Sequence, residues 1–259
     1  MQQPYDPRMC GRYTHLFTWK QLHRLLSLTS PEVTLTNAYN VAPTQHQPVV
    51  MLDEAQDGLA LRPMRWGLVP SWAKDIAIGN SLLNARSEGI ESKPSFRAAF
   101  KRRRCIVPMS GFYEWQKVEG SRTKQPYYIF PAPNSPTAPS DDPTGAMWLA
   151  AGLWESWHDP ALPKDAPALE SFSVITTSAN TAMAPIHDRM PIFLDPAQAR
   201  MWITAKEGAD VAPLLTPCPP AWLAFRKVST LVNSPRNDSP QCIQEAVPQD
   251  FGSIFDPQD

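Results

Sequence analysis

Several features that would place a protein in a class at once are missing from this sequence. No apolar run approaches the roughly 18 residues that a membrane-spanning helix needs, and the first eight residues lack the apolar core of a secretory signal. Neither sign of charge dominates, because the formal net charge is only −1 at pH 7. This balance argues against a large basic surface that coats nucleic acid, but it leaves a local basic groove open.

Cysteine is scarce and widely spaced, at Cys10, Cys105, Cys218 and Cys242. The four residues form no CxxC pair and no paired CxxH, so a structural zinc site and a disulfide scaffold are both disfavoured. We expect free thiols in a reducing compartment, the cytoplasm of a bacterium or the nucleus of a eukaryotic cell. We also expect a monomeric chain with no metal, no cofactor and no membrane contact.

Glycine is outnumbered by proline, 11 residues to 29, which favours strands and loops over long helices. The spacing of apolar residues predicts a helix over 15–28, with Thr14 as its cap. A second helix is predicted to begin at Asp195 and Pro196 and to end near Ile203. A further short helix is possible near 207–215. The candidate strands are rich in β-branched and aromatic residues, and they are 47–52, 59–69, 103–117, 126–131, 147–157, 171–177, 190–194 and 222–229.

This pattern of many strands, few helices and no βαβ alternation predicts one α+β domain built on antiparallel sheet. We expect the domain to span 9–233. Within it, residues 131–145 hold five prolines and form a surface loop between two strands. We expect a leader, 1–8, that is absent from or removed in the active protein, and a polar, poorly ordered tail, 234–259.

The segment MCGRY, around Cys10, precedes the first helix. A small buried thiol is the plain interpretation of this cysteine. A second interpretation follows if translation starts at Met9, because removal of that methionine leaves Cys10 as the amino terminus. Its α-amine, with a reference pKa of roughly 7.7–8.0, then lies beside its thiol. Such a pair condenses with an aldehyde to a Schiff base, which the thiol closes to a five-membered thiazolidine.

Two further segments offer aromatic and basic side chains of the kind that bind single-stranded nucleic acid. In RWGLVPSW, Gly67 and Pro70 indicate an exposed turn, where Trp66 or Trp72 can stack on an unpaired base unless both belong to the core. In NARSE, Arg86 is a candidate phosphate contact. The basic run Lys101–Arg104 is either a solvated face or part of the same surface.

Candidate polar groups for catalysis stand in three other motifs. Asn40, in YNVAPT, is either a turn residue or an amide that orients a catalytic terminus or substrate. Glu114, in SGFYEW, is either exposed or faces a partly apolar pocket that raises its pKa into a range useful for acid–base catalysis. In HDRMPIFL, His187 is either structural or a proton-transfer group, and Arg189 binds phosphate or orients Glu114.

In this order, these motifs resemble the SOS response-associated peptidase (SRAP) family, from about Met9 to Asn233. The resemblance implies a compact α+β unit with antiparallel sheets around a DNA-binding groove and a few peripheral helices. It implies binding of single-stranded DNA and a covalent thiazolidine between the amino-terminal cysteine and the ring-opened aldehyde of an abasic site. It also implies lyase-type activity, and peptidase-type activity that removes residues ahead of the cysteine, in the response to DNA damage.

The resemblance further implies roles for particular residues. Cys10 is the nucleophile, and Asn40 positions it. Glu114 handles protons during Schiff-base formation and ring closure, and His187 assists opening of the deoxyribose. The side chains expected to line the DNA groove are Arg12, Trp66, Trp72, Arg86 and Arg189.

This mechanism requires Cys10 to be residue one, because an internal residue has no free α-amine. We favour translation from Met9 over clipping of residues 1–8, and either route would meet the requirement. Two rival functions stay open. One is a cysteine peptidase that acts on other proteins through Cys10, His187 and either Glu114 or Asp188. The other is a noncatalytic module that binds single-stranded DNA through its tryptophans and arginines.

Overall fold

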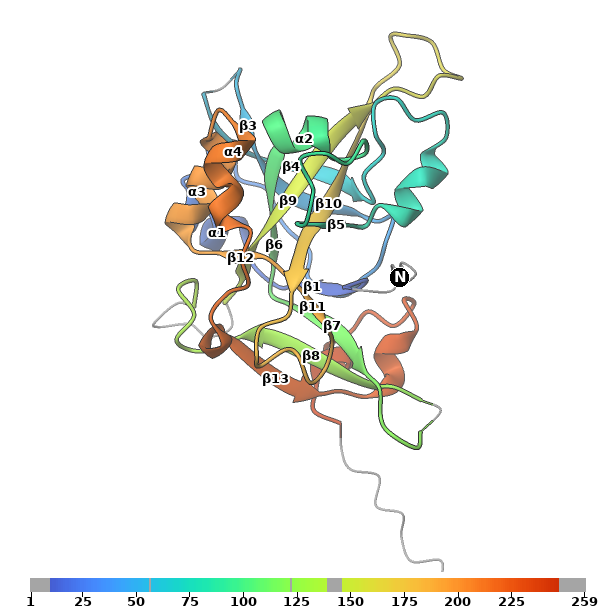
Figure 1. Cartoon of the computed structure of the whole chain (residues 1–259), viewed down its shortest axis with the longest axis vertical. Coiled ribbons are helices and arrows are strands. Elements are labelled where there is room, and N and C mark those ends of the chain that lie inside the picture. The colour runs from blue at the N-terminus through green and yellow to red at the C-terminus, as the bar shows by residue number, and fades with distance from the viewer. Residues whose placement is uncertain (1–9, 56, 122, 139–145, 247–259) are drawn as a thin grey trace, which may run out of the picture.

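The computed structural model describes residues 10–55, 57–121, 123–138 and 146–246. The expected leader and the last part of the chain, from residue 247, lie outside these ranges, as does much of the expected loop over 131–145. The fold is α+β, as the sequence predicts, with strands in two sheets and a few short helices beside them (Figure 1).

Five strands of the larger sheet close into a ring, in the order β10, β4, β3, β6, β9, with β9 pairing back to β10. An odd number of strands cannot close through antiparallel pairs alone, and the exception is β10 with β4, which run parallel. The predicted antiparallel pairing is therefore confirmed for the rest of the ring. The ring strands are β3 (His46–Asp53), β4 (Gly58–Trp66), β6 (Arg104–Met109), β9 (Trp148–Trp157) and β10 (Leu169–Ser178).

Three short strands extend this ring at its edges. β5 (Asn84–Arg86) runs parallel to β10, β11 (Arg189–Pro191) runs antiparallel to β10, and β12 (Phe193–Leu194) runs antiparallel to β9. β5 and β11 both lie against the last residues of β10, around Thr176. The arginines of NARSE and HDRMPIFL are brought to one place in this way.

The smaller sheet lies below the ring in Figure 1, and its neighbouring strands are all antiparallel. Its order is β13, β8, β7, β1, β2. The bounds are β1 (Tyr13–His15), β2 (Ala38–Val41), β7 (Gly111–Gln116), β8 (Gln125–Pro131) and β13 (Leu223–Lys227). Short strands β1, β2 and β5 escape sequence prediction because three or four residues carry too little alternation.

A single long strand over 103–117 is wrong, because the chain leaves one sheet and enters the other at Ser110. The backbone N–H of Ser110 donates to Thr14 O at 2.9 Å, and its hydroxyl accepts from the N–H of Leu16 at 2.9 Å. These bonds fasten the corner to the β1 segment. The corner joins β6 of the ring to β7 of the smaller sheet, and β7 carries Glu114.

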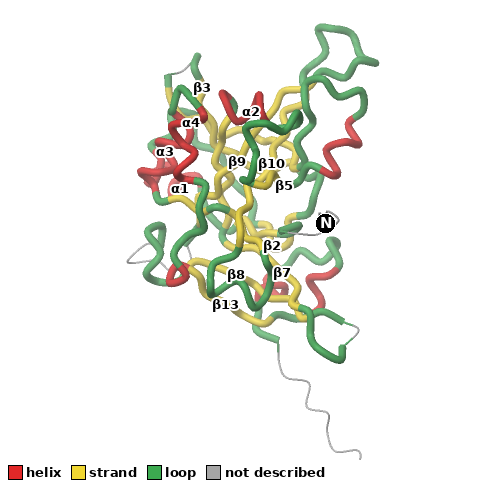
Figure 2. Tube along the Cα trace, in the orientation of Figure 1, coloured by secondary structure: helices red, strands yellow, loops and turns green. Residues whose placement is uncertain are grey.

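The helices lie beside the ring, with α1, α3 and α4 gathered on one side (Figure 2). Their bounds are α1 (Trp19–Leu26), α2 (Arg97–Arg102), α3 (Pro196–Thr204) and α4 (Gly208–Val211). The Asp195 cap of α3 is confirmed by its bond from Gln198 N–H at 2.8 Å. The Thr14 cap is wrong: Thr14 belongs to β1, and Thr18 caps α1 in a capping box with Gln21.

Two residues of the basic run Lys101–Arg104, namely Arg103 and Arg104, have partners inside the protein. Arg104 is only 3% exposed, and its guanidinium donates to the carbonyl oxygens of Phe100, Lys101, Trp202 and Ala205. These are carbonyls at the ends of α2 and α3, which a helix leaves without internal partners. Arg103 pairs with Glu155 at 2.6 Å. One residue of the basic run therefore ties two helix ends together and a second forms an ion pair, while Lys101 and Arg102 are exposed.

The tail is not poorly ordered where the structure describes it. Residues 234–246 pack against β2 and β13, with a 3-10 turn at Pro240–Ile243 and Cys242 fully buried. Arg226 of β13 donates to Ile243 O at 2.9 Å. The prolines and polar residues that suggested disorder instead form turns whose backbone carbonyls bind the domain. Among the described residues, no helix is long and apolar enough to cross a membrane.

His15 makes the fold sensitive to acid. It is 4% exposed on β1, and burial lowers the pKa of its imidazole to about 4 from 6.5. Between these values the unfolded chain binds more protons than the folded one, so stability falls as pH falls. We expect this residue to cost about 2 kcal/mol of unfolding free energy between pH 7 and pH 5.

Urea denaturation of a His15→Gln variant at both pH values measures this effect. The variant should lose that part of the pH dependence, whatever its stability at pH 7. His46→Gln, at the exposed start of β3, is the matched control and should keep it. Equal pH dependence in the His15 variant and the wild type would contradict the assignment.

Candidate active site

Cys10 is brought to Glu114 by the pairing of β1 with β7. In this antiparallel pair Tyr13 lies opposite Phe112. Followed toward the amino terminus, the same register carries Cys10 to the far half of β7. There its backbone nitrogen donates to Glu114 Oε1 at 2.6 Å. The two residues lie 104 positions apart in the chain, so only the tertiary structure makes them neighbours.

Both residues are nearly inaccessible to solvent, with Cys10 5% and Glu114 2% exposed. Burial raises the pKa of the Glu114 carboxyl, and His187 and the hydrogen bonds from Cys10 offset this rise only in part. Burial also raises the pKa of the Cys10 thiol well above its usual value, and the charge of Glu114 raises it further. The thiol is therefore protonated at neutral pH. The apolar surroundings and raised pKa predicted for Glu114 are confirmed.

His187 reaches the same site from the turn between β10 and β11. Its Nδ1 accepts a hydrogen bond from the backbone N–H of Arg189 at 3.0 Å. The turn is fastened to β7, because Gln116 Nε2 donates to Pro185 O at 2.9 Å. His187 lowers the pKa of Glu114, which places the imidazole within electrostatic reach of the carboxylate. The cysteine, the glutamate and the histidine therefore converge from three separate segments.

Arg189 is 8% exposed, and Glu88 holds its guanidinium. Nη1 and Nη2 donate to the two carboxylate oxygens of Glu88 at 2.5 and 2.9 Å, and Nη2 also donates to Thr176 O at 2.7 Å. Arg86 and Lys93 belong to the same cluster, because the charges of Glu88, Arg86 and Arg189 all act on the Lys93 ammonium. The alternative in which Arg189 orients the buried carboxylate of β7 is wrong, since its terminal nitrogens are directed to Glu88.

Asn40 does not orient Cys10 directly. It is 1% exposed on β2, and its Nδ2 donates to three carbonyl oxygens of residues 232–237 at 2.8 to 3.2 Å. Its Oδ1 accepts from Arg12 Nη1 at 2.9 Å. Arg12 also donates to the carbonyls of Val232 and Asn233. Both residues join β1 and β2 to the C-terminal segment, and Asn40 is linked to the Cys10 segment through Arg12.

The two tryptophans of RWGLVPSW have opposite environments. Trp66 is fully buried, lies 5.0 Å from the Tyr13 ring between centroids, and donates from Nε1 to Leu83 O at 3.1 Å. It offers no face to a base, so its predicted place in a DNA groove is wrong. Trp72 is 57% exposed in the turn after β4. It is therefore the tryptophan of this motif that can stack on an unpaired base.

All four cysteines are free and buried. Within the described ranges, no group of three or more His, Cys, Asp and Glu side chains is placed to hold a metal ion. The site itself offers a thiol, a carboxyl group and an imidazole.

Sequence reasoning missed Glu88 and Lys93. Glu88 stands two residues after Arg86, but it lies in the turn that follows β5, where strand alternation does not apply. Lys93 joins the cluster from the same loop. Neither residue had a signal in the sequence beyond its charge.

The fold and the site together define a class: a single α+β domain with a closed five-stranded ring, a second sheet, and a buried cysteine–glutamate pair at their junction. The profile of the SOS response associated peptidase (SRAP) family matches residues 9–235. The chain belongs to this family.

Relatives agree with this assignment. Abasic site processing protein YoqW of Bacillus subtilis (strain 168) is 34% identical over 240 residues, which cover 91% of this chain and 99% of that protein. Abasic site processing protein HMCES of Rattus norvegicus is 34% identical over 81% of this chain and 65% of that protein. A crystal structure of a protein from Bacteroides thetaiotaomicron superimposes with a TM-score of 0.75 at 25% identity, covering 92% of this chain and all of that one.

Proposed function

We propose that the chain captures abasic sites in single-stranded DNA through a covalent thiazolidine at Cys10, once Cys10 is the amino terminus. The observation that carries this proposal is the 2.6 Å distance between the backbone nitrogen of Cys10 and Glu114 Oε1. A carboxyl group thus lies beside the atom that must become the nucleophile, which supports an acid–base role for Glu114. The names of the relatives from Bacillus subtilis and rat support the substrate.

The reaction balances without an oxidant or a reductant. The α-amine of Cys10 adds to the aldehyde carbon of the ring-opened deoxyribose, and loss of one water gives the imine. Glu114, with its raised pKa, supplies the proton that the departing hydroxyl needs. The sulfur of Cys10 then adds to the imine carbon, and the thiol proton passes to nitrogen as the thiazolidine closes.

Opening of the closed deoxyribose precedes these steps. Most abasic sites are hemiacetals, so a proton must move between the ring oxygen and the hydroxyl at the anomeric carbon. His187 serves this transfer, because it reaches the site beside Glu114 and an imidazole can both accept and donate a proton. Arg86, Arg189 and Trp72 bind the DNA strand by its phosphates and by a stacked base.

Two further activities belong to the same site. An imine at the abasic carbon acidifies the neighbouring hydrogens, so elimination of the phosphate gives lyase-type cleavage when ring closure fails. Hydrolysis of the bond before Cys10 would release the amine, and Glu114 is placed to protonate the leaving nitrogen. That second activity is a peptidase reaction of the chain on itself.

The rival functions fit the site less well. A cysteine peptidase acting on other proteins needs a thiolate, but burial and Glu114 raise the pKa of the Cys10 thiol. A noncatalytic binding module gives no reason to bury a carboxyl group against a cysteine. It also loses one of its two predicted platforms, since Trp66 is buried.

A denaturing gel tests the proposal directly. Purified protein is incubated with a single-stranded oligonucleotide that carries one abasic site, and Cys10→Ala is compared with the wild type. We expect a shifted protein–DNA band in the wild type alone. Cys105→Ala removes another buried thiol and should keep the band. The absence of any band in the wild type, with Cys10 confirmed by mass as the first residue, would contradict the proposal.

A further inference from the structure

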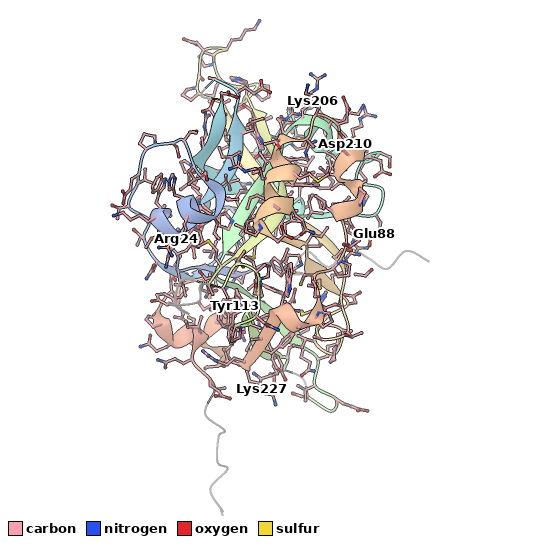
Figure 3. The ribbon with its side chains drawn as sticks, turned by 90° about the vertical axis from the view of Figure 1, so that its left-hand side faces the viewer. Arg24, Glu88, Tyr113, Lys206, Asp210 and Lys227 are labelled. Atoms are coloured by element: carbon pink, nitrogen blue, oxygen red, sulfur yellow. The ribbon has the colours of Figure 1, made fainter. Side chains whose placement is uncertain are left out.

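The carboxylate of Glu88 occupies a position among three cationic side chains at the edge of the site. It receives two hydrogen bonds from Arg189, and its charge acts on Lys93, on which Arg86 also acts. The Glu88 side chain is 56% exposed, whereas that of Arg189 is 9% exposed. Figure 3 shows Glu88 at the periphery of the molecule. The anion of this ion pair is therefore a largely exposed side chain, whereas its main cationic partner is buried.

Arg189 is also within electrostatic reach of the reactive cysteine, because its charge lowers the pKa of the Cys10 thiol. The guanidinium Nε atoms of Arg189 and Arg86 are buried and have no hydrogen-bond partner among the residues that the structure describes. The cluster thus holds donors that the Glu88 carboxylate does not use. A phosphate group presents more acceptor oxygens than a carboxylate and binds a guanidinium in the same bidentate way.

We propose that Glu88 is a placeholder for a backbone phosphate: in the free protein its carboxylate occupies the place on Arg189 that a phosphodiester next to the abasic nucleotide takes in the complex. This inference rests on the function proposed above and adds a regulatory element to it. Glu88 keeps a buried arginine paired while the site is empty. It also weakens binding of every strand, because the phosphate that binds Arg189 must first displace this carboxylate.

The placeholder predicts a distinctive salt dependence. A phosphate that displaces Glu88 still lies beside that carboxylate, so the wild-type cluster offsets little of the strand's charge. In Glu88→Gln the opposing charge is gone, and one more phosphate is neutralised and releases its condensed cation, so the slope of log K against log salt should steepen by about 0.7 for one single-strand phosphate. The affinity itself should rise about three- to tenfold at low salt, as for loss of one competing ion pair.

The test measures binding by fluorescence anisotropy of a single-stranded oligonucleotide that carries a tetrahydrofuran abasic analogue, which cannot crosslink. Glu170→Gln is the matched control, because it removes the same charge from another arginine pair, Arg62–Glu170, at the opposite end of β10. Oligonucleotides with a neutral methylphosphonate on either side of the analogue identify the phosphate. The gain in Glu88→Gln should vanish with one of these two substitutions.

Each outcome decides the inference. Tighter binding with a steeper salt slope in Glu88→Gln, beyond the change in Glu170→Gln, supports the placeholder. Glu88→Ala should change binding in the same direction, and near-UV circular dichroism checks that both variants fold. Equal or weaker binding in folded variants, or a gain that both methylphosphonates leave intact, would overturn it. If neither wild type nor variant binds any strand, the proposed function itself fails, and this inference fails with it.

Discussion

A chain with one glycine ahead of Cys10 is expected to form no stable crosslink with abasic DNA, whereas a chain that begins at Cys10 crosslinks fully. The added residue turns the α-amine into an amide, and an amide nitrogen cannot form the imine. The glycine has an α-amine that can still form an imine, but no thiol is positioned to close it to a five-membered ring. Any remaining adduct is therefore this imine or a thiohemiacetal of the Cys10 thiol, and both are reversed on denaturation. Intact mass before the reaction and a denaturing gel after it measure the two quantities that matter, the first residue and the covalent product.

The backbone of Cys10 gives this prediction a second consequence. Its φ of 44° lies in the left-handed region, which a residue other than glycine adopts at a cost of about 1–3 kcal/mol. That cost exists only while a peptide bond precedes Cys10. We therefore expect slow loss of the added glycine in the wild type but not in Glu114→Gln. A crosslink formed by protein whose mass still includes the glycine would refute the amine mechanism.

Replacement of Glu114 by glutamine is expected to lower the crosslinking rate by about 10²- to 10⁴-fold, the usual contribution of general acid–base catalysis. Glutamine still accepts a hydrogen bond from the Cys10 nitrogen, but it cannot transfer a proton. The pH profile should also change its shape. In the wild type the rate rises as the amine loses its proton and falls as Glu114 loses its own. The variant should keep only the rise.

The free energy of unfolding of Glu114→Gln distinguishes a loss of catalysis from a loss of folded structure. Burial raises the pKa of Glu114, so above its ordinary value of 4.5 the folded chain binds more protons than the unfolded one. Stability therefore falls as pH rises through this window, and Glu114→Gln should remove that loss. Glu155→Gln, a buried glutamate paired with Arg103 in the ring, should be less stable but crosslink normally. An unchanged rate and pH profile in Glu114→Gln would remove this residue from the mechanism.

Sequence patterns predicted most of the ring. Strands β3, β4, β9 and β10 combine a length of eight to ten residues with many β-branched and aromatic side chains, which is where such reasoning succeeds. The capped start of α3 was also readable, because Asp195 and Pro196 act on neighbouring atoms. The break at Ser110 was not, since both halves of 103–117 are strands and only their sheets differ.

The site was predicted in part. Glu114 was placed in an apolar pocket from the alternation of its own strand, and the structure agrees. Asn40, Arg12 and Trp66 were assigned to catalysis or DNA from their residue types, and the structure gives them internal partners instead. An amide, a guanidinium and an indole serve a binding surface or a buried network equally well, so residue type alone could not choose.

What the sequence by itself determined is local: the strand-forming segments, the helix caps, and a cysteine with the chemistry to capture an aldehyde once its amine is free. These depend on atoms a few residues apart. The tertiary structure decided which distant groups share a site, bringing Glu114 to Cys10 across 104 residues and Glu88 to Arg189 across 101. The reason is strand register, because the pairing of β1 with β7, and of β5 and β11 with β10, fixes these contacts, and no single segment encodes it.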